Sequence, residues 1–163
     1  MRNVNSIPKK IMDVASLQKQ VNIWKFLGKK IVFTNGCFDI LHEGHIYSLS
    51  QAASFGDILL VGVNSDASVK KLKGEARPVN NEHSRSLLLA SLAIVDAVTI
   101  FGEDTPLDLI KTVLPDVLVK GGDYTVAQIA GAKEVIANGG EVKIVPLLQG
   151  FSTTGIIDRI HAL

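Results

Sequence analysis

From Lys29 onward, short apolar segments alternate with longer segments in which apolar residues recur every three or four positions, and Gly, Asp and Pro separate them. Such alternation is typical of βαβ units, in which helices join parallel strands. Continuous apolar runs such as 58–63 suit strands that are covered on both faces, as the strands of parallel sheets are. We therefore predict an α/β fold.

The boundaries of the elements follow from hydrophobic periodicity and turn residues. We predict strands at 30–34, 57–63, 96–101, 116–120 and 141–146, and helices at 44–55, 66–72, 82–94, 105–113, 126–138 and 152–161. This order indicates a Rossmann-like three-layer fold with a central parallel sheet of about five strands flanked by helices.

Residues 1–28 precede the alternating pattern. Leu17, Val21, Trp24 and Leu27 recur at helical spacing before Gly28 ends the predicted helix. We predict an N-terminal helical extension at 1–28, packed on its own domain or on a partner subunit, followed by one domain at 29–163.

The composition limits the partners that we expect. Of 163 residues, 47% are hydrophobic, which suits one compact domain with a buried core. The net charge of +1 lacks the basic excess typical of nucleic-acid-binding surfaces. A single cysteine excludes an internal disulfide, and we find no signal-peptide pattern or membrane-spanning apolar run. We expect a soluble, cytoplasmic protein without nucleic-acid or membrane partners.

The most informative motif is the strand–turn–helix segment that contains His42-Glu43-Gly44-His45. A strand at 30–33 leads through a turn at 34–39 into a helix that continues at helical spacing. The start of that helix offers unpaired backbone N–H groups to phosphate oxygens. Residues three apart share a helix face, so both imidazoles can turn toward one anion.

Two histidines at this spacing also occur as surface residues or as a metal-binding pair. The metal interpretation lacks a third ligand, because Cys37 precedes the pair on a turn and no further His or Cys lies nearby in the sequence. We predict no metal site formed by protein groups alone.

Further polar clusters follow the other predicted strands, at the edge where ligands bind in open parallel sheets. The lysines of 70–73 and Arg77 form either a solvated basic loop or a segment that closes over phosphates. The paired glycines of 120–124 suit a ligand rim as well as a tight turn. Residues 152–154 begin the last helix, as a cap or as a phosphate site.

Three residues have plausible structural roles instead. Arg85 lies one turn into a predicted helix whose other face is leucine-rich, so we expect it to anchor that helix rather than touch substrate. Asp39 has the alternative role of an Asx turn, and Cys37 is expected to pack rather than to act as a nucleophile.

Several segments in the same order resemble one enzyme family. They are 34–45 (TNGCFDILHEGH), 63–68 (VNSDAS), 72–80 (LKGEARPVN), 103–106 (EDTP), 118–124 (LVKGGDY) and 152–154 (STT). They are similar to the nucleotidyltransferases with a His-x-Gly-His signature, and most to the adenylyltransferase domain of the bifunctional heptose 7-phosphate kinase/heptose 1-phosphate adenylyltransferase. The resemblance covers about 29–160 and identifies 29–163 as a nucleotidyltransferase domain, which we expect to be a stand-alone form.

The resemblance implies transfer of AMP from ATP to D-glycero-β-D-manno-heptose 1-phosphate, giving ADP-heptose and pyrophosphate for the lipopolysaccharide inner core. Mg²⁺ is expected as the cofactor because triphosphates bind as the metal complex. The resemblance implies a homo-oligomer, dimeric or larger. In-line displacement at the α-phosphorus needs no protein nucleophile, so the residues act by positioning and electrostatics.

The resemblance also assigns roles to individual residues. The catalytic set is His42, His45, Lys71 and Lys73. Nucleotide contacts are expected from Thr34, Asn35, Gly36, Cys37, Phe38, His42, His45, Lys120, Gly121, Ser152, Thr153 and Thr154. Substrate contacts are expected from Asp39, Arg77 and Asp123.

Two alternatives stay open. The first is glycerol-3-phosphate cytidylyltransferase or another sugar-phosphate nucleotidyltransferase. Cytidylyltransferases of this kind carry an Arg-Thr pair before the last motif, where this chain has Leu147-Leu148, so cytosine recognition is disfavoured. The second is a nucleotide-binding module without turnover, which the intact histidines and lysines argue against.

Overall fold

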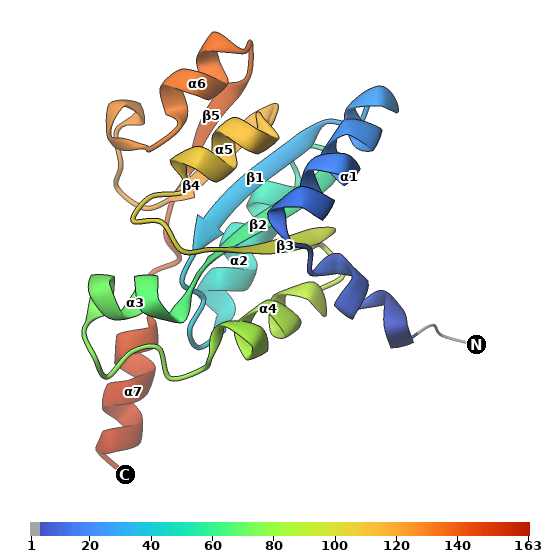
Figure 1. Ribbon diagram of the computed structural model, residues 1–163. Coiled ribbons are helices and arrows are strands. Elements are labelled where there is room, and N and C mark those ends of the chain that lie inside the picture. The colour runs from blue at the N-terminus through green and yellow to red at the C-terminus, as the bar shows by residue number, and fades with distance from the viewer. Residues whose placement is uncertain (1–3) are drawn as a thin grey trace.

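A parallel sheet of five strands forms the centre of the structure, a computed structural model that describes residues 4–163. The strands are β1 (Ile31–Gly36), β2 (Ile58–Asn64), β3 (Ala97–Phe101), β4 (Val117–Gly121) and β5 (Glu141–Val145). Helices cover both faces (Figure 1), so the predicted three-layer α/β fold is confirmed.

The strand order is β3-β2-β1-β4-β5. The chain therefore builds outward from β1 to β3 on one side, and then returns to place β4 and β5 on the other. Strand order reverses between β1 and β4, where Val32 pairs with Val117 and Thr34 with Val119. In open parallel sheets, the carboxyl ends of the strands at such a reversal form a natural crevice for a ligand.

The helices complete the fold around this sheet. They are α1 (Val14–Phe26), α2 (Glu43–Ala53), α3 (Asp66–Lys73), α4 (Glu82–Ala90), α5 (Leu107–Val113), α6 (Ala132–Ala137) and α7 (Thr153–His161), with 3-10 turns η1 (Val4–Ser6), η2 (Pro8–Lys10) and η3 (Val126–Gln128).

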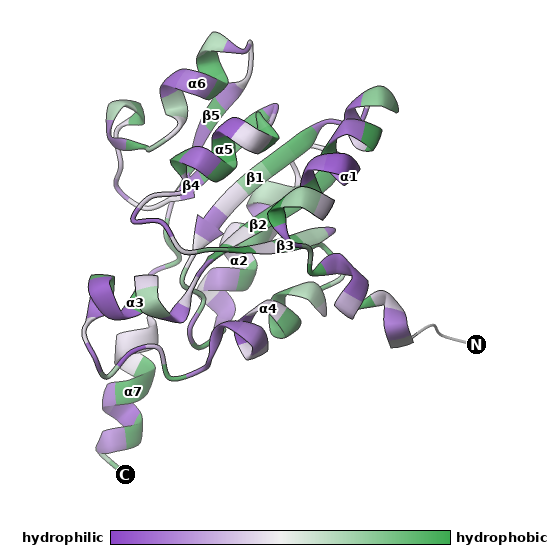
Figure 2. Cartoon of the chain, viewed as in Figure 1, coloured by the Kyte–Doolittle hydropathy of each residue, from purple (hydrophilic) through white to green (hydrophobic). Residues whose placement is uncertain are grey.

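Two clusters of buried apolar side chains hold the layers together. One joins α1, α5 and α6 to one face of the sheet, around residues such as Phe33 and Leu118. The other joins α2 and α4 to the opposite face, around Val61 and Val119. Figure 2 shows β1 changing from hydrophobic to hydrophilic along its length, because Ile31 begins the strand in the core and Asn35 lies near its carboxyl end at the polar edge.

The N-terminal helix α1 belongs to this core. Leu17 and Val21 are buried beside Phe33, and Ile11 forms a parallel bridge with Val98 of β3. Packing on its own domain is therefore the arrangement that the structure shows for α1. The division of the chain at Gly28 into an extension and a domain stays a prediction.

Carboxylates secure the amino ends of the strands. The side chain of Asp116 accepts a hydrogen bond from the backbone N–H of Ile31 at 2.7 Å, and that of Asp96 accepts one from Leu59 at 2.8 Å. Asp57 does the same for Lys30 at 2.8 Å. These carboxylates link neighbouring segments at the amino ends of the strands, which lie opposite the reversal crevice.

Two helix predictions were wrong in extent. The helix predicted at 126–138 is divided into η3 and α6, because Gly131 adopts a left-handed conformation (φ +83°) with Ile110 packed against it. The helix predicted at 82–94 ends at Ala90, and the chain turns through 91–96 toward β3. Among residues 4–163, no helix is both long and apolar enough to span a membrane.

Candidate active site

A pocket of about 580 Å³ opens at the carboxyl ends of β1 and β4. It brings together residues from segments that are far apart in the sequence: Thr34, Asn35, Gly36, Cys37, Phe38, His45, Ser48, Leu49, Asn64, Leu72, Lys73, Asp104, Thr105, Pro106, Lys120, Gly121, Tyr124, Gln128, Ile129, Ala130 and Leu147. Its position matches the crevice expected where strand order reverses.

The turn after β1 forms one wall of this pocket. A Cβ atom at Gly36 would lie 3.1 Å from the ring of Phe38, so glycine allows the ring to fold back over the strand end. Phe38 itself has φ +49°, a conformation that non-glycine residues rarely adopt. The turn is thus held in a strained shape that aims the Phe38 ring toward α2.

His42 and His45 stack on each other at the start of α2. Their ring centroids are 3.8 Å apart with an interplanar angle of 23°, and the Phe38 ring lies 5.3 Å from His45. The Nδ1 atoms of both rings are buried and lack a hydrogen-bond partner among residues 4–163. Buried polar atoms of this kind point to a bound group that would satisfy them.

Burial and neighbouring charges keep both imidazoles neutral. Desolvation, together with the nearby His42 and Lys73, lowers the pKa of His45 to about 4. Desolvation also lowers the pKa of His42. An anion in the pocket would reverse this effect, because an opposite charge favours the protonated form.

Glycine at position 44 permits the close packing of this corner. A Cβ atom there would lie 3.1 Å from Nδ1 of His42 and 3.2 Å from Cβ of Phe151. The loop that leads into α7 therefore passes directly against the first turn of α2.

The end of α3 supplies positive charge to the pocket. Lys73 lines it, whereas Lys71 extends into solvent and pairs with Asp104 at 3.4 Å. Both partners of that pair are well exposed, so the pair contributes little stability and Lys71 is free to exchange Asp104 for another anion.

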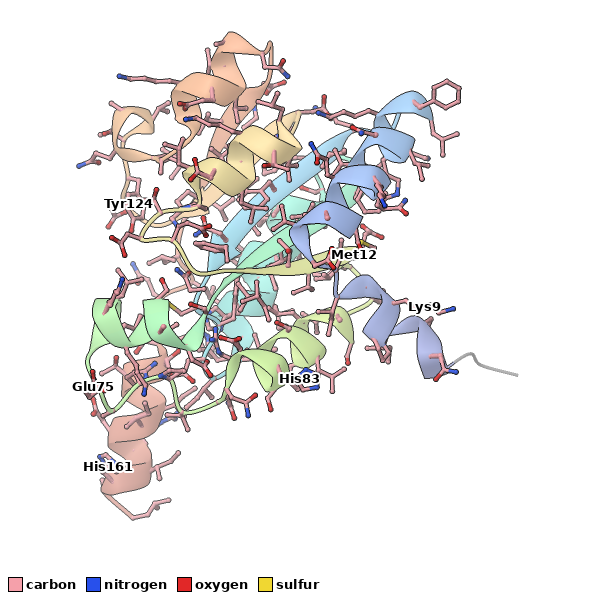
Figure 3. All side chains as sticks on the ribbon, in the orientation of Figure 1. Lys9, Met12, Glu75, His83, Tyr124 and His161 are labelled. Atoms are coloured by element: carbon pink, nitrogen blue, oxygen red, sulfur yellow. The ribbon has the colours of Figure 1, made fainter. Side chains whose placement is uncertain are left out.

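The opposite wall is formed by the segment after β4. Nζ of Lys120 donates to Oδ1 of Asn35 at 3.3 Å and lies 5.8 Å from the centre of the Tyr124 ring. Desolvation lowers the pKa of Lys120, and the adjacent Cys37 opposes that effect. Tyr124 stands on the loop beyond β4 (Figure 3), and its ring packs against Gly122.

Comparison with known proteins places this geometry in a family. A family model described as cytidylyltransferase-like matches residues 33–159. The chain belongs to the cytidylyltransferase-like family. The match begins in β1 and ends in α7, so it contains every segment that lines the pocket.

Individual relatives agree with this assignment. The chain is 53% identical over 158 residues to the bifunctional protein HldE of Rhodospirillum rubrum, covering 97% of this chain and 32% of that protein. It is 56% identical over 153 residues to the protein of the same name from Haemophilus influenzae, covering 94% and 32%. The chain thus spans about a third of the length of these relatives.

Solved structures share the fold. The lipopolysaccharide core biosynthesis protein from Thermoplasma volcanium is 32% identical, with a TM-score of 0.61 over 74% of this chain and 98% of that one. A pantoate-β-alanine ligase from Francisella tularensis aligns with a TM-score of 0.62 over 94% of this chain and 78% of that one. At 16% identity, the ligase supports the fold alone.

Within this cytidylyltransferase-like domain, the pocket brings together half of the predicted site. Its lining includes Thr34, Asn35, Gly36, Cys37, Phe38, His45, Lys73, Lys120 and Gly121. His42 stacks directly beneath His45. Their contacts with nucleotide stay predictions, but they lie where such contacts are geometrically possible.

Other predicted residues are engaged elsewhere. The carboxylate of Asp39 is buried and accepts from Nε of Arg77 at 2.6 Å and from the backbone of Val79 and Asn80. These hydrogen bonds outweigh desolvation and hold the pKa of Asp39 below its usual value. In the structure, the carboxylate of Asp39 therefore holds the loop at 77–80 in place. Its role in binding substrate stays a prediction.

The last motif and Asp123 lie outside the pocket lining. Oγ of Ser152 accepts from the backbone N–H of Gly155 at 3.0 Å, which is the ordinary N-cap arrangement. Thr153 and Thr154 form the first turn of α7, and Asp123 is exposed beside Tyr124. Nucleotide or substrate contacts for these residues stay predictions.

The predicted site set left out several residues that line the pocket. Asn64 ends β2, Asp104 follows β3, and Leu147 follows β5. Each stands just after a predicted strand, so the rule that ligands bind at carboxyl ends could have found them. Tyr124 belonged to a recognised motif and could have been included for the same reason.

Proposed function

We propose that this chain transfers AMP from ATP to D-glycero-β-D-manno-heptose 1-phosphate, releasing pyrophosphate and forming ADP-heptose for the lipopolysaccharide inner core. The observation that carries the proposal is the stacked pair of histidines beside the reversal crevice, in which His45 lines the pocket and the buried Nδ1 atoms of both rings lack a hydrogen-bond partner among the described residues. The identity of 53–56% to HldE and the resemblance to a heptose 1-phosphate adenylyltransferase domain support this choice of substrates.

The reaction needs positioning rather than a protein nucleophile. A phosphate oxygen of the sugar 1-phosphate attacks the α-phosphorus of ATP, and the bond from that phosphorus to the oxygen bridging to the β-phosphate breaks. Pyrophosphate leaves with the electron pair of this bond, so negative charge builds on its oxygen. A protein accelerates such a step by aligning the two phosphates and by stabilising the charge that builds on the leaving group.

His42 and His45 would stabilise that charge. The unsatisfied Nδ1 atoms need a partner, and phosphate oxygens would provide one. As the triphosphate enters, its negative charge raises the pKa of each imidazole and favours hydrogen-bond donation to it. The pair then acts as a preorganised set of donors.

The lysines of α3 would neutralise the remaining phosphate charge. Lys73 already lines the pocket, and Lys71 can leave its exposed contact with Asp104. Lys120, which is desolvated at the other wall, adds a third cation. Two lysines that line the cavity and a third at its edge suit a substrate pair with several phosphate groups.

We propose Mg²⁺ as the accompanying metal ion. Among residues 4–163, no group of three or more His, Cys, Asp or Glu side chains could hold it. We therefore propose that substrate phosphates and water supply most of the ligands of the ion. Asp104, at the pocket edge, would add a protein oxygen ligand. When bound, the ion would neutralise phosphate charge.

The remaining parts of the proposal concern the molecule in its cell. We propose that it acts in the cytoplasm, where ATP is available, and that it forms a dimer or a larger homo-oligomer. Sedimentation velocity of the purified chain would test the second point, and a purely monomeric boundary would contradict it.

Pyrophosphate release with Mg²⁺ tests the reaction. ATP, CTP and GTP would each be paired with D-glycero-β-D-manno-heptose 1-phosphate or with glycerol 3-phosphate. Release with ATP and the heptose alone is expected. Release with CTP and glycerol 3-phosphate would identify a cytidylyltransferase, and nucleotide binding without release under any pairing would identify a binding module.

A further inference from the structure

Arg85 is a charged side chain that is completely buried, with 0% of its surface exposed. Burying a guanidinium is costly unless hydrogen bonds and a counter-charge replace the lost water. Here its Nε donates to the carbonyl of Asn80 at 2.9 Å, and Nη1 donates to the carbonyl of Cys37 at 2.6 Å. Nη2 donates to the carbonyl of Asn64 at 2.7 Å and to Oδ1 of Asp66 at 2.8 Å.

These four acceptors belong to three segments at the functional edge: the turn after β1, the junction of β2 with α3, and the loop before α4. Cys37 is in the turn after β1, Asn64 ends β2, Asp66 begins α3 and Asn80 precedes α4. Cys37 and Asn64 both line the pocket. The planar guanidinium of Arg85 therefore links the turn at 37–39 to α3, which carries the lysines. We call the turn at 37–39 the histidine turn, because it leads to His42 and His45.

The contact with Cys37 reaches the histidines through one residue. Cys37 is followed directly by Phe38, whose left-handed backbone directs its ring to within 5.3 Å of His45. A strained turn holds its shape only while its surroundings constrain it. The hydrogen bond from Arg85 is the nearest such constraint on the N-terminal side of Phe38.

A second set of bonds constrains the other side of the same turn. Asp39 accepts from the backbone N–H groups of Val79 and Asn80 at 2.8 and 2.9 Å, and Asn80 in turn gives its carbonyl to Arg85. The turn at 37–39 and the loop at 77–80 are thus bound as one unit with the guanidinium at its centre.

We propose that Arg85 is a positioning residue of the transfer reaction, which fixes the histidine turn relative to the first turn of α3. It thereby sets the distance between His45 and the lysines at the far end of α3. This inference rests on the proposed function, because it assigns Arg85 a role in the same phosphate site. Arg85 does not line the pocket and touches no substrate.

The test compares Arg85→Lys with Val95→Ala. Lysine keeps the charge but has no fork to reach four acceptors. Val95 is equally buried, in the apolar cluster beneath α4, so its truncation supplies a matched loss of thermal stability away from the site. We expect Arg85→Lys to lower kcat about 10- to 100-fold with a KM for ATP close to wild type, whereas Val95→Ala keeps kcat.

Proton NMR of the His45 ring gives a readout that does not depend on turnover. Because the Phe38 ring centroid lies 5.3 Å from that of His45, we expect its ring current to shift the His45 resonances and movement of the turn to change them. We expect a change in Arg85→Lys and none in Val95→Ala. Unaltered His45 resonances in a folded Arg85→Lys protein would overturn the proposal, whatever happens to kcat.

A second variant covers the case in which Arg85→Lys does not fold. Asp66→Asn removes the counter-charge of the guanidinium at a side chain that is 34% exposed. We expect a smaller fall in kcat and a smaller shift of the His45 resonances. If both stay at wild-type values, the proposal fails. If wild-type protein releases no pyrophosphate, the proposed function fails instead, and the resonances alone decide the role of Arg85.

Discussion

Two imidazoles whose ring centres lie 3.8 Å apart repel each other when both are cations, and a nearby anion offsets that repulsion. Under the proposed function, this pairing favours a negatively charged ligand. In the protein alone, the buried rings stay neutral and do not repel each other. With a polyphosphate present, their donors become useful where the leaving group gains charge.

Removing one donor of this pair tests its role. His45→Ala should lower turnover by several hundred-fold, the order seen when one preorganised donor is lost. The matched control is His83→Ala, since His83 is exposed on α4 (Figure 3) and lies outside the pocket. Steady-state pyrophosphate release measures both. Near-normal turnover in a folded His45→Ala protein would reject the catalytic role.

The lowered pKa of His45 also predicts how stability depends on pH. Between pH 6.5 and about 4, the unfolded chain binds a proton on this imidazole that the folded chain does not. Stability should therefore fall as the pH drops through this window, by at most about 3 kcal/mol. Urea denaturation across this range should show a shallower fall for His45→Gln than for His83→Gln. Parallel curves would contradict the assignment.

At the scale of elements, α3 has two unequal ends. Its first turn is fixed by the Ser65 cap, by Glu82 and by Arg85, whereas its last turn carries exposed lysines. An element that is firm at one end and free at the other can present cations to a ligand without loosening the core.

Truncation of the pocket lysine measures this contribution. Lys73→Ala should lower kcat/KM for ATP about 10- to 100-fold, because a charge that faces the phosphates is lost. Lys70→Ala is the control, since Lys70 makes an exposed pair with Glu75 at 4.0 Å and does not line the pocket. Equal effects of the two substitutions would show that α3 acts by general charge alone.

The break before α6 gives a prediction on stability. Gly131 and Gly139 share φ +83°, but a Cβ atom at Gly131 would lie 2.7 Å from the side chain of Ile110. At Gly139 no described atom lies within 4 Å of that position. Gly139→Ala should cost about 1 kcal/mol, and Gly131→Ala a further 1–3 kcal/mol or so from overpacking. Similar unfolding midpoints for both variants would contradict the packing argument.

The interruption of the predicted helix at Gly131 shows what the sequence pattern could not predict. Apolar patterning and turn residues placed all five strands within two residues of their ends, and burial on both faces imposes a continuous apolar run on central strands such as β2. The helix at 126–138 was too long because Val126, Ile129 and Ile136 keep helical spacing across Gly131. The conformation of Gly131 depends on contact with Ile110, which local periodicity does not contain.

At the scale of the whole molecule, the sheet order accounts for the location of the site. The parallel topology carries the ends of β1, β2, β3, β4 and β5 to one edge, so residues that follow each of the five strands line one pocket, whereas the predicted residues 152–154 and Asp123 lie outside its lining. The sequence did not predict which of these segments contact one another. The bonds from Asp39 to residues about forty positions away required the folded chain.

Removal of the metal ion should separate catalysis from folding. Because no described group of three ligating side chains could hold an ion, EDTA should abolish pyrophosphate release without changing the thermal midpoint of the nucleotide-free protein. Added Mg²⁺ should restore activity. A fall in the midpoint with EDTA alone would indicate a metal site built by the protein.

The left-handed backbone of Phe38 carries a cost for the molecule as a whole. Glycine at this position would relieve the strain but would remove the ring that packs beside His45. Phe38 is also buried in the apolar cluster beneath α2 and α4, and truncating a buried Phe costs about 3–5 kcal/mol, more than the roughly 1–3 kcal/mol of backbone strain. Selection for resistance to heat and selection for the shape of the histidine site would therefore both retain this ring.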